Sequence, residues 1–161
     1  MKGAIVTEPM LGLHSGFITC ISVQEMFDFL RDTNSETKVT EVMCAAIESG
    51  MFDRKPTILY CDVDTIYVKI NATELNSAVN ESKYICSLIN YALRLEIQDA
   101  VKQNIFPFAK TLYIADEIYF KAKKRYIAKL IMYKNTEIKY PIFKFTGYKI
   151  NHIEDLLNKD I

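Results

Sequence analysis

Two short apolar runs meet at a pair of aspartates, and this pattern constrains the fold more than any other part of the sequence. Residues 57–70 are rich in Ile, Leu, Tyr and Val on both sides of Asp62, Val63 and Asp64. Branched and aromatic side chains favour strands, whereas Asp favours turns because its side chain hydrogen-bonds the local backbone. The sequence therefore predicts a β-hairpin at about residues 57–70, with the acids at its tip.

Three other segments have apolar residues at helical spacing. They are residues 18–30, residues 39–47 and a longer segment at about residues 82–102. The apolar face of the longest consists of Ile85, Leu88, Ile89, Ala92 and Leu95. Gly50 stands where a left-handed C-cap would end the second helix, and Pro107 signals the exit from the third.

The remainder of the chain is β-prone. The short segments are residues 112–114, 118–120, 125–133 and 142–145, with Asn135 and Pro141 as breakers. These segments predict an α+β fold, a mixed sheet with helices on one face. No repeat or long linker divides the 161 residues, so we expect one domain, residues 1–161.

Charge and cysteine content exclude several classes of protein. Acidic and basic residues balance at 20 each, so no global basic field indicates binding to nucleic acid or to an anionic membrane. The four cysteines are widely spaced, which argues against a zinc site and predicts reduced intracellular thiols. No apolar run approaches the roughly 20 residues that span a bilayer, and no signal peptide is evident. We expect a cytoplasmic protein without membrane contact.

The acidic pair suggests metal chemistry. Asp62 and Asp64 would repel each other if buried without a cation, and Mg²⁺ would relieve this because it prefers hard oxygen ligands and keeps positions open for phosphates. In nucleotidyl transfer two metals need several carboxylates, so one hairpin supplies only part of such a site. The alternative is a solvated turn, which an isolated Asp-x-Asp more often is.

The context of the acids resembles motif C of family B DNA polymerases, Y-x-D-T-D-S between apolar strands. Tyr60, Asp62, Asp64 and Tyr67 fit that motif, whereas Val63 replaces its Thr and a Thr replaces its Ser. The resemblance implies that Asp64 is an essential metal ligand for Mg²⁺ and that Asp62 lies beside the site in a supporting role. It also implies the antiparallel β-sheet of a polymerase palm with packed helices.

A local basic stripe lies in residues 121–129 despite the zero net charge. If this segment is a strand, Lys121, Lys123 and Arg125 share one face, and Lys124 and Tyr126 point the other way. The structural alternative is an edge strand that lysines protect from aggregation.

The same stripe resembles the K-K-R-Y motif that follows motif C in family B polymerases. Lys123, Lys124, Arg125 and Tyr126 match it, within a strand region at about residues 117–134. The resemblance implies that these residues lie along the minor groove of primer-template DNA. Basic side chains suit that position because they can contact phosphates and the acceptors that all base pairs share.

The order of elements also fits the resemblance, since residues 144–149 resemble the K-x-x-G segment that leaves the palm. Motif A, motif B, the exonuclease acids and the thumb have no counterpart, so the chain should not polymerise DNA alone. We expect a subunit of a split viral or bacteriophage polymerase, in the host cytoplasm or a viral replication compartment. Its partners would be complementary subunits carrying motifs A and B, primer-template DNA and, in the assembled enzyme, dNTP.

Two other interpretations stay open. The chain could be a non-enzymatic nucleic-acid-binding or assembly module that inherited the palm fold. It could also be an unrelated α+β protein in which both motifs are coincidental, and then Asp64 and Lys124 should lie far apart or on opposite faces. His14 and His152 have no recognisable partner by spacing, and Tyr60 and Tyr67 are assigned no role.

Overall fold

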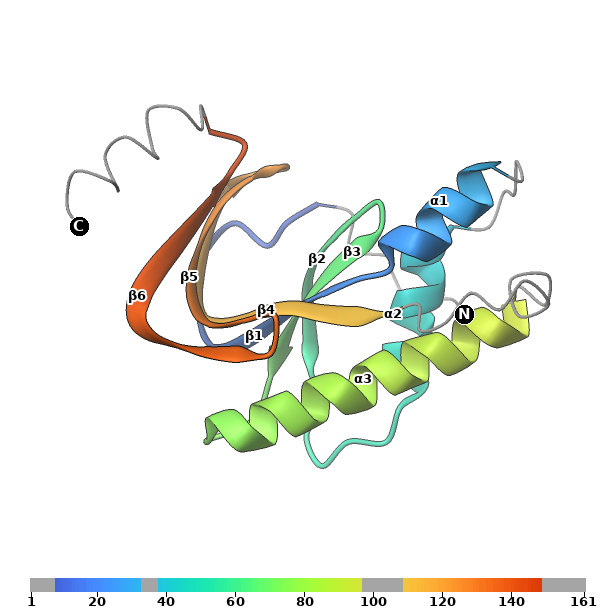
Figure 1. Cartoon of the computed structure of the whole chain (residues 1–161), viewed down its shortest axis with the longest axis horizontal. Coiled ribbons are helices and arrows are strands. Elements are labelled where there is room, and N and C mark those ends of the chain that lie inside the picture. The colour runs from blue at the N-terminus through green and yellow to red at the C-terminus, as the bar shows by residue number, and fades with distance from the viewer. Residues whose placement is uncertain (1–7, 33–37, 97–108, 149–161) are drawn as a thin grey trace.

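The computed structural model describes residues 8–32, 38–96 and 109–148 as one six-stranded sheet with three helices (Figure 1). The strand order is β2-β3-β1-β4-β5-β6, and every neighbouring pair is antiparallel. The elements are β1 (Gly12–Ser22), α1 (Gln24–Asp32), α2 (Val39–Ser49), β2 (Thr57–Asp62), β3 (Thr65–Ile70), α3 (Leu75–Glu96), β4 (Lys110–Ala122), β5 (Arg125–Tyr133) and β6 (Thr136–Thr146). The fold class is α+β with an antiparallel sheet, and the mixed sheet expected from the segments alone is wrong.

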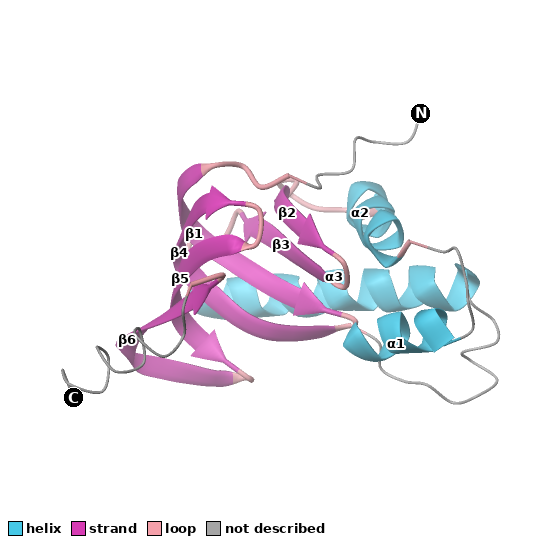
Figure 2. Ribbon diagram, turned by 90° about the horizontal axis from the view of Figure 1, so that it is seen from above, coloured by secondary structure: helices cyan, strands magenta, loops and turns pink. Residues whose placement is uncertain are grey.

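The three helices lie on one side of the sheet (Figure 2). Between them and the strands lies a mainly aliphatic layer, in which α2 and α3 contribute Met43, Ile47, Ile85 and Ile89. We call this the aliphatic layer. A second buried cluster contains residues of the strands and none of the three helices, so both faces of the sheet are covered.

The prediction of a helix at residues 18–30 is wrong for its N-terminal part. Residues 18–22 belong to β1, which pairs with β3 on one side and β4 on the other, and the helix begins only at Gln24. All five of these residues are buried. A strand in the middle of a sheet that is buried on both faces loses the polar alternation of a half-exposed strand, and its apolar run resembles a buried helix segment.

Helix α2 covers the predicted segment, but Gly50 does not end it in the left-handed conformation. Its φ is −71° and its ψ is 156°, which is extended backbone. A Cβ at this position would lie 2.6 Å from Leu88 Cδ1 and 2.6 Å from Phe52 Cε2. A larger residue at this position would have to displace the ends of the Leu88 and Phe52 side chains, so glycine suits the close packing here and not a left-handed backbone.

Helix α3 begins at Leu75, several residues before the expected start. Its end as described is Glu96, so residues 97–102 and Pro107 of the sequence expectation lie outside the described residues. Ile85 and Ile89 of the expected apolar face are buried, whereas Leu95 is exposed.

The C-terminal region forms longer strands than the sequence suggested. Residues 112–114 and 118–120 belong to a single strand, β4, whose register against β5 shifts around Ala115. Asn135 does end a strand, because Lys134 and Asn135 both have positive φ, as a type I′ turn requires. Pro141 does not break β6, which is the edge strand and has a free side where a missing N–H is tolerated.

Candidate functional site

The acidic pair lies at the tight turn between β2 and β3, which we call the acidic tip (Asp62, Val63 and Asp64). Asp62 pairs with Thr65, and Val63 has a φ of 53°. The Thr65 hydroxyl donates to Asp64 Oδ1 at 2.9 Å, and the Val23 backbone N–H donates to the Asp64 carbonyl at 2.9 Å. These two bonds fix Asp64 against the junction of β1 and α1, with both carboxylates half-buried.

The basic motif also lies at a hairpin turn, which corrects its expected placement within a strand. Lys123 and Lys124 connect β4 to β5, and Lys124 has a φ of 60°. We call these two residues the basic tip. Because strand alternation ends at the turn, Lys121, Lys123 and Arg125 do not share a strand face as predicted. Lys123, Lys124 and Arg125 are exposed, whereas Tyr126 is buried.

The two tips touch each other. Lys124 Nζ lies 3.7 Å from Asp62 Oδ1, and the Lys124 backbone N–H donates to the Tyr60 hydroxyl at 3.2 Å. The hydroxyl groups of Tyr67 and Tyr126 also form a hydrogen bond. A side-chain ion pair, a backbone bond and a buried hydroxyl pair thus join the acidic hairpin to the basic one.

Curvature of the sheet explains how hairpins that are not neighbours can meet. Strands β3 and β1 separate β2 from β4, yet rings from β2, β3, β4 and β5 pack together on the face without helices. Figure 1 shows β4, β5 and β6 curling toward that side. This second buried layer, which we call the aromatic layer, has at its centre the rings of Tyr60, Tyr67, Tyr113, Phe120 and Tyr126.

Contacts within the aromatic layer are close. The Tyr60 and Tyr67 rings stack with centroids 5.7 Å apart, and Phe120 meets both rings edge to face at 5.7 and 6.0 Å. Sequence reasoning assigned Tyr60 and Tyr67 no role, but their hydroxyls bind the basic hairpin. Their position beside the acids was visible in the sequence, whereas the partners across the curved sheet were not.

Burial keeps these tyrosines neutral. Desolvation raises the pKa of Tyr60 to about 12, and it also raises the pKa of Tyr67 and of Tyr126. The neutral hydroxyls can donate and accept hydrogen bonds at neutral pH. They therefore hold the two hairpins together and do not act as bases.

The segment resembling K-x-x-G also reaches the basic tip. Gly147 has a φ of 81°, and a Cβ built on it would lie 2.0 Å from the Lys124 carbonyl oxygen. Any side chain here would collide with the turn. The absence of a side chain at Gly147 therefore allows the end of β6 to press against the basic hairpin.

The acidic tip offers part of a cation site. Asp62 and Asp64 supply the hard oxygen ligands that Mg²⁺ prefers, on a turn whose backbone is fixed. Among the residues described, no group of three or more His, Cys, Asp or Glu side chains is placed to hold a metal. A closed metal site built from these residues alone is thus absent, and further ligands would have to come from elsewhere.

Cysteine and histidine residues do not extend the site. None of the four cysteines forms a disulfide, all four are buried, and Cys44 Sγ lies 3.3 Å from Cys61 Sγ. The Cys44 hydrogen bond and burial raise the pKa of the Cys61 thiol. His14 Nε2 hydrogen-bonds the Met10 carbonyl at 2.7 Å, and His152 lies outside the described residues.

Comparison with known proteins gives no assignment: no protein-family model matches the chain, and no curated protein matches it significantly. Within the described part of the chain, no helix is long and apolar enough to cross a membrane.

Proposed function

We propose that the chain forms the C-terminal part of the palm of a family B DNA polymerase and works as a subunit of a split enzyme. The observation that supports this most is the contact between the tips, where Lys124 meets Asp62 at 3.7 Å. In the proposed enzyme the acidic tip holds metal beside the primer terminus and the basic tip holds the duplex. The proposed palm requires the two motifs to lie close together, whereas coincidental motifs could lie anywhere on the fold.

Each group has a distinct task in this proposal. Asp64 is the principal metal ligand and Asp62 supports it. Bound Mg²⁺ would stabilise the charge on the attacking and leaving oxygens of nucleotidyl transfer. Lys123, Lys124 and Arg125 are exposed and contact primer-template DNA. Tyr126 is 6% exposed, so we assign it a positioning role through its hydroxyl bond to Tyr67.

The complementary chains supply what these residues do not. A second metal-binding carboxylate, in the setting of motif A, and a cation for the triphosphate, in the setting of motif B, are both required for catalysis. The active species is therefore the assembled complex with primer-template DNA and dNTP.

Primer extension by the reconstituted complex tests the proposal. Asp64→Ala should reduce extension in Mg²⁺ by at least about 100-fold, because it removes a charge that acts in the transition state. Asp53→Ala is the matched control, since Asp53 is an exposed acid in the loop before β2. Equal extension by wild type and Asp64→Ala would contradict the catalytic role and favour the non-enzymatic binding or assembly module.

Duplex binding tests the basic tip separately. Replacing Lys123, Lys124 and Arg125 with Ala should weaken binding to all sequences alike and lower the salt dependence by about 0.9 per lost phosphate contact. Lys83→Ala, on the exposed side of α3, is the control. Unchanged affinity and salt dependence would contradict DNA contact by this tip.

A further inference from the structure

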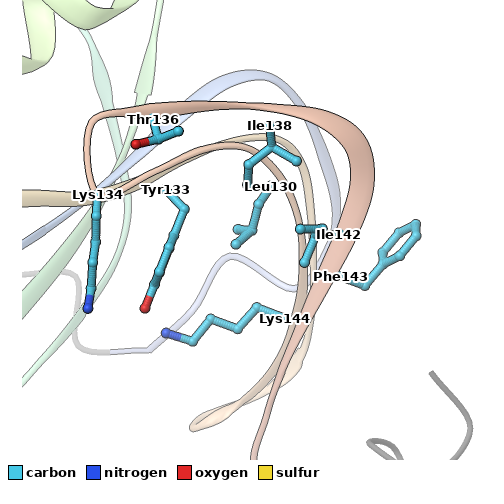
Figure 3. A pocket seen from close by; sticks show the side chains of 8 residues that line it. All are labelled: Leu130, Tyr133, Lys134, Thr136, Ile138, Ile142, Phe143 and Lys144. Atoms are coloured by element: carbon cyan, nitrogen blue, oxygen red, sulfur yellow. The ribbon is translucent and has the colours of Figure 1, made fainter. Parts of the chain in front are cut away.

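A groove of about 630 Å³ lies within the curve of the β5–β6 hairpin (Figure 3). It shares no lining residue with either tip. Leu130, Ile138 and Ile142 are among the apolar residues that line it, and the ends of Tyr133, Lys134 and Lys144 point together toward one side (Figure 3).

A local irregularity in β6 forms this groove. Leu130 pairs with Ile142 and Met132 pairs with Glu137, so residues 138–141 of β6 lie opposite residue 131 alone. Extra residues in one strand bend it away from its partner. The groove is therefore built into the fold and does not depend on the rotamer of one side chain.

The groove and its rim present apolar surface to solvent. Ile142 is 49% exposed, Phe143 40% and Tyr133 41%, and Tyr140 of the same strand as Ile142 and Phe143 is 79% exposed. Apolar side chains that are exposed together at a groove are a common feature of binding sites. Among the strands that the structure describes, β6 is at the edge of the sheet, so it pairs with β5 on one side and with no strand on the other.

The charge at the groove has one sign. No acid lines it, and neither Lys134 nor Lys144 forms an ion pair within residues 8–32, 38–96 and 109–148. Instead, Lys134 Nζ lies 5.4 Å from the centre of the Tyr133 ring, and Lys144 Nζ lies 5.2 Å from that of Tyr113. Among the described residues, no carboxylate occupies either ammonium group.

We propose that this groove docks a separate protein chain through an apolar segment that carries carboxylate side chains. Apolar side chains of the partner fill the groove, and its carboxylates pair with Lys134 and Lys144. Nucleic acid fits less well, since it needs cations spaced along its backbone. Here the two cations of the groove point to one side.

The identity of the partner rests on the proposed function, whereas docking itself does not. In a split polymerase, the docked chain is the one that carries motifs A and B. Binding assays that need no polymerisation therefore separate the two ideas.

Selection from displayed peptides tests the docking. A library of short overlapping peptides covers every protein encoded by the source genome. Peptides that bind the full chain are enriched from it, and their affinities for purified variants are then measured by titration. The groove variants are Lys134→Ala/Lys144→Ala and Ile138→Ser/Ile142→Ser, and the control is Lys83→Ala/Lys121→Ala, exposed lysines outside the groove. Circular dichroism establishes that each variant is folded.

Apolar peptides containing Asp or Glu should bind the wild type and the control, and the lysine variant should weaken their binding by about 10-fold, as expected for lost charge pairs. Replacing the peptide's acids with amides should cause a similar loss on the wild type and little further loss on the lysine variant. Methyl NMR shifts at Ile138 and Ile142 place the peptide in the groove even if the serine variant fails to fold.

Three results would overturn the proposal. One is that every enriched peptide binds the groove variants as tightly as it binds the wild type. Another is that oligodeoxythymidylate, not peptide, shifts the groove methyl groups. The last is self-association in sedimentation that the groove variants abolish, which would make a second copy the occupant. A groove-dependent peptide from a protein without polymerase motifs would support docking and contradict the assigned partner.

Discussion

The two buried layers of this protein are built in different ways. The aliphatic layer lies between separate elements, since helices pack on the sheet, and its side chains come from α1, α2, α3 and the strands. The aromatic layer forms where the sheet curls upon itself, and it contains buried hydroxyl groups. The aliphatic layer contains the larger number of buried residues. The aromatic layer holds the acidic and basic hairpins together.

We expect the largest loss of stability when the ring at the centre of the aromatic layer is removed. Phe120 is fully buried and meets Tyr60 and Tyr67, so Phe120→Ala should lower the free energy of unfolding by about 3–5 kcal/mol. Met43→Ala in the aliphatic layer should cost about 2–5 kcal/mol. Urea denaturation measures both changes.

Amide NMR then distinguishes the effects of the two layers on the basic tip. Only Phe120→Ala should shift the Lys124 amide signal, because that amide donates to the Tyr60 hydroxyl. An equal shift in Met43→Ala would contradict the idea that the aromatic layer, and not the aliphatic layer, positions the basic tip.

Alkaline pH should weaken the aromatic layer through ionisation of Tyr60. The pKa of Tyr60 rises from 10.0 to about 12 through burial, so below pH 10 the group is neutral in both states and its contribution is complete. Between pH 10 and pH 12 the unfolded chain loses the proton while the folded chain keeps it, which favours unfolding. A shift of this size corresponds to a loss on the order of 3 kcal/mol.

Denaturant titrations across that pH interval measure this loss. In Tyr60→Phe the decline in stability with pH should be shallower than in the wild type, whatever the stability of the variant at neutral pH. Identical pH profiles would mean that Tyr60 does not resist ionisation in the folded state.

A smaller effect is expected from the hydroxyl pair that joins the hairpins. Tyr67→Phe removes one hydrogen-bond partner of the buried Tyr126 hydroxyl, which also bonds Thr146, and should cost about 0.5–1.5 kcal/mol. Tyr91→Phe, at a side chain 65% exposed, should change little. Thermal unfolding of the two variants compares them, and an unchanged Tyr67→Phe would show that the hydroxyl pair is not needed to hold the hairpins together.

Secondary structure was predicted correctly from the sequence where the apolar residues recur with a clear strand or helix period. The hairpin of residues 57–70 and helix α2 have clear strand and helix signals, and the fold class follows from them. The prediction failed for β1, because burial on both faces removes the alternation that identifies a strand.

The candidate site could be predicted only in part for a different reason. Its residue types are visible in the sequence, but Val63 and Lys124 adopt left-handed turn conformations without being glycine. The contact between Lys124 and Asp62 depends on sheet curvature, which no local pattern encodes.

The position of β1 has a consequence for the order of events during synthesis. Emerging first, β1 lies in the middle of the sheet, where Phe17 pairs with Ile70 and Thr19 with Ile114. The hairpin β2–β3 can pair with one side of β1 as soon as it forms, but the other side of β1 must wait with its backbone groups unpaired until β4 arrives. The basic tip lies between β4 and β5, so the two tips first become one structure only after β5 has also left the ribosome.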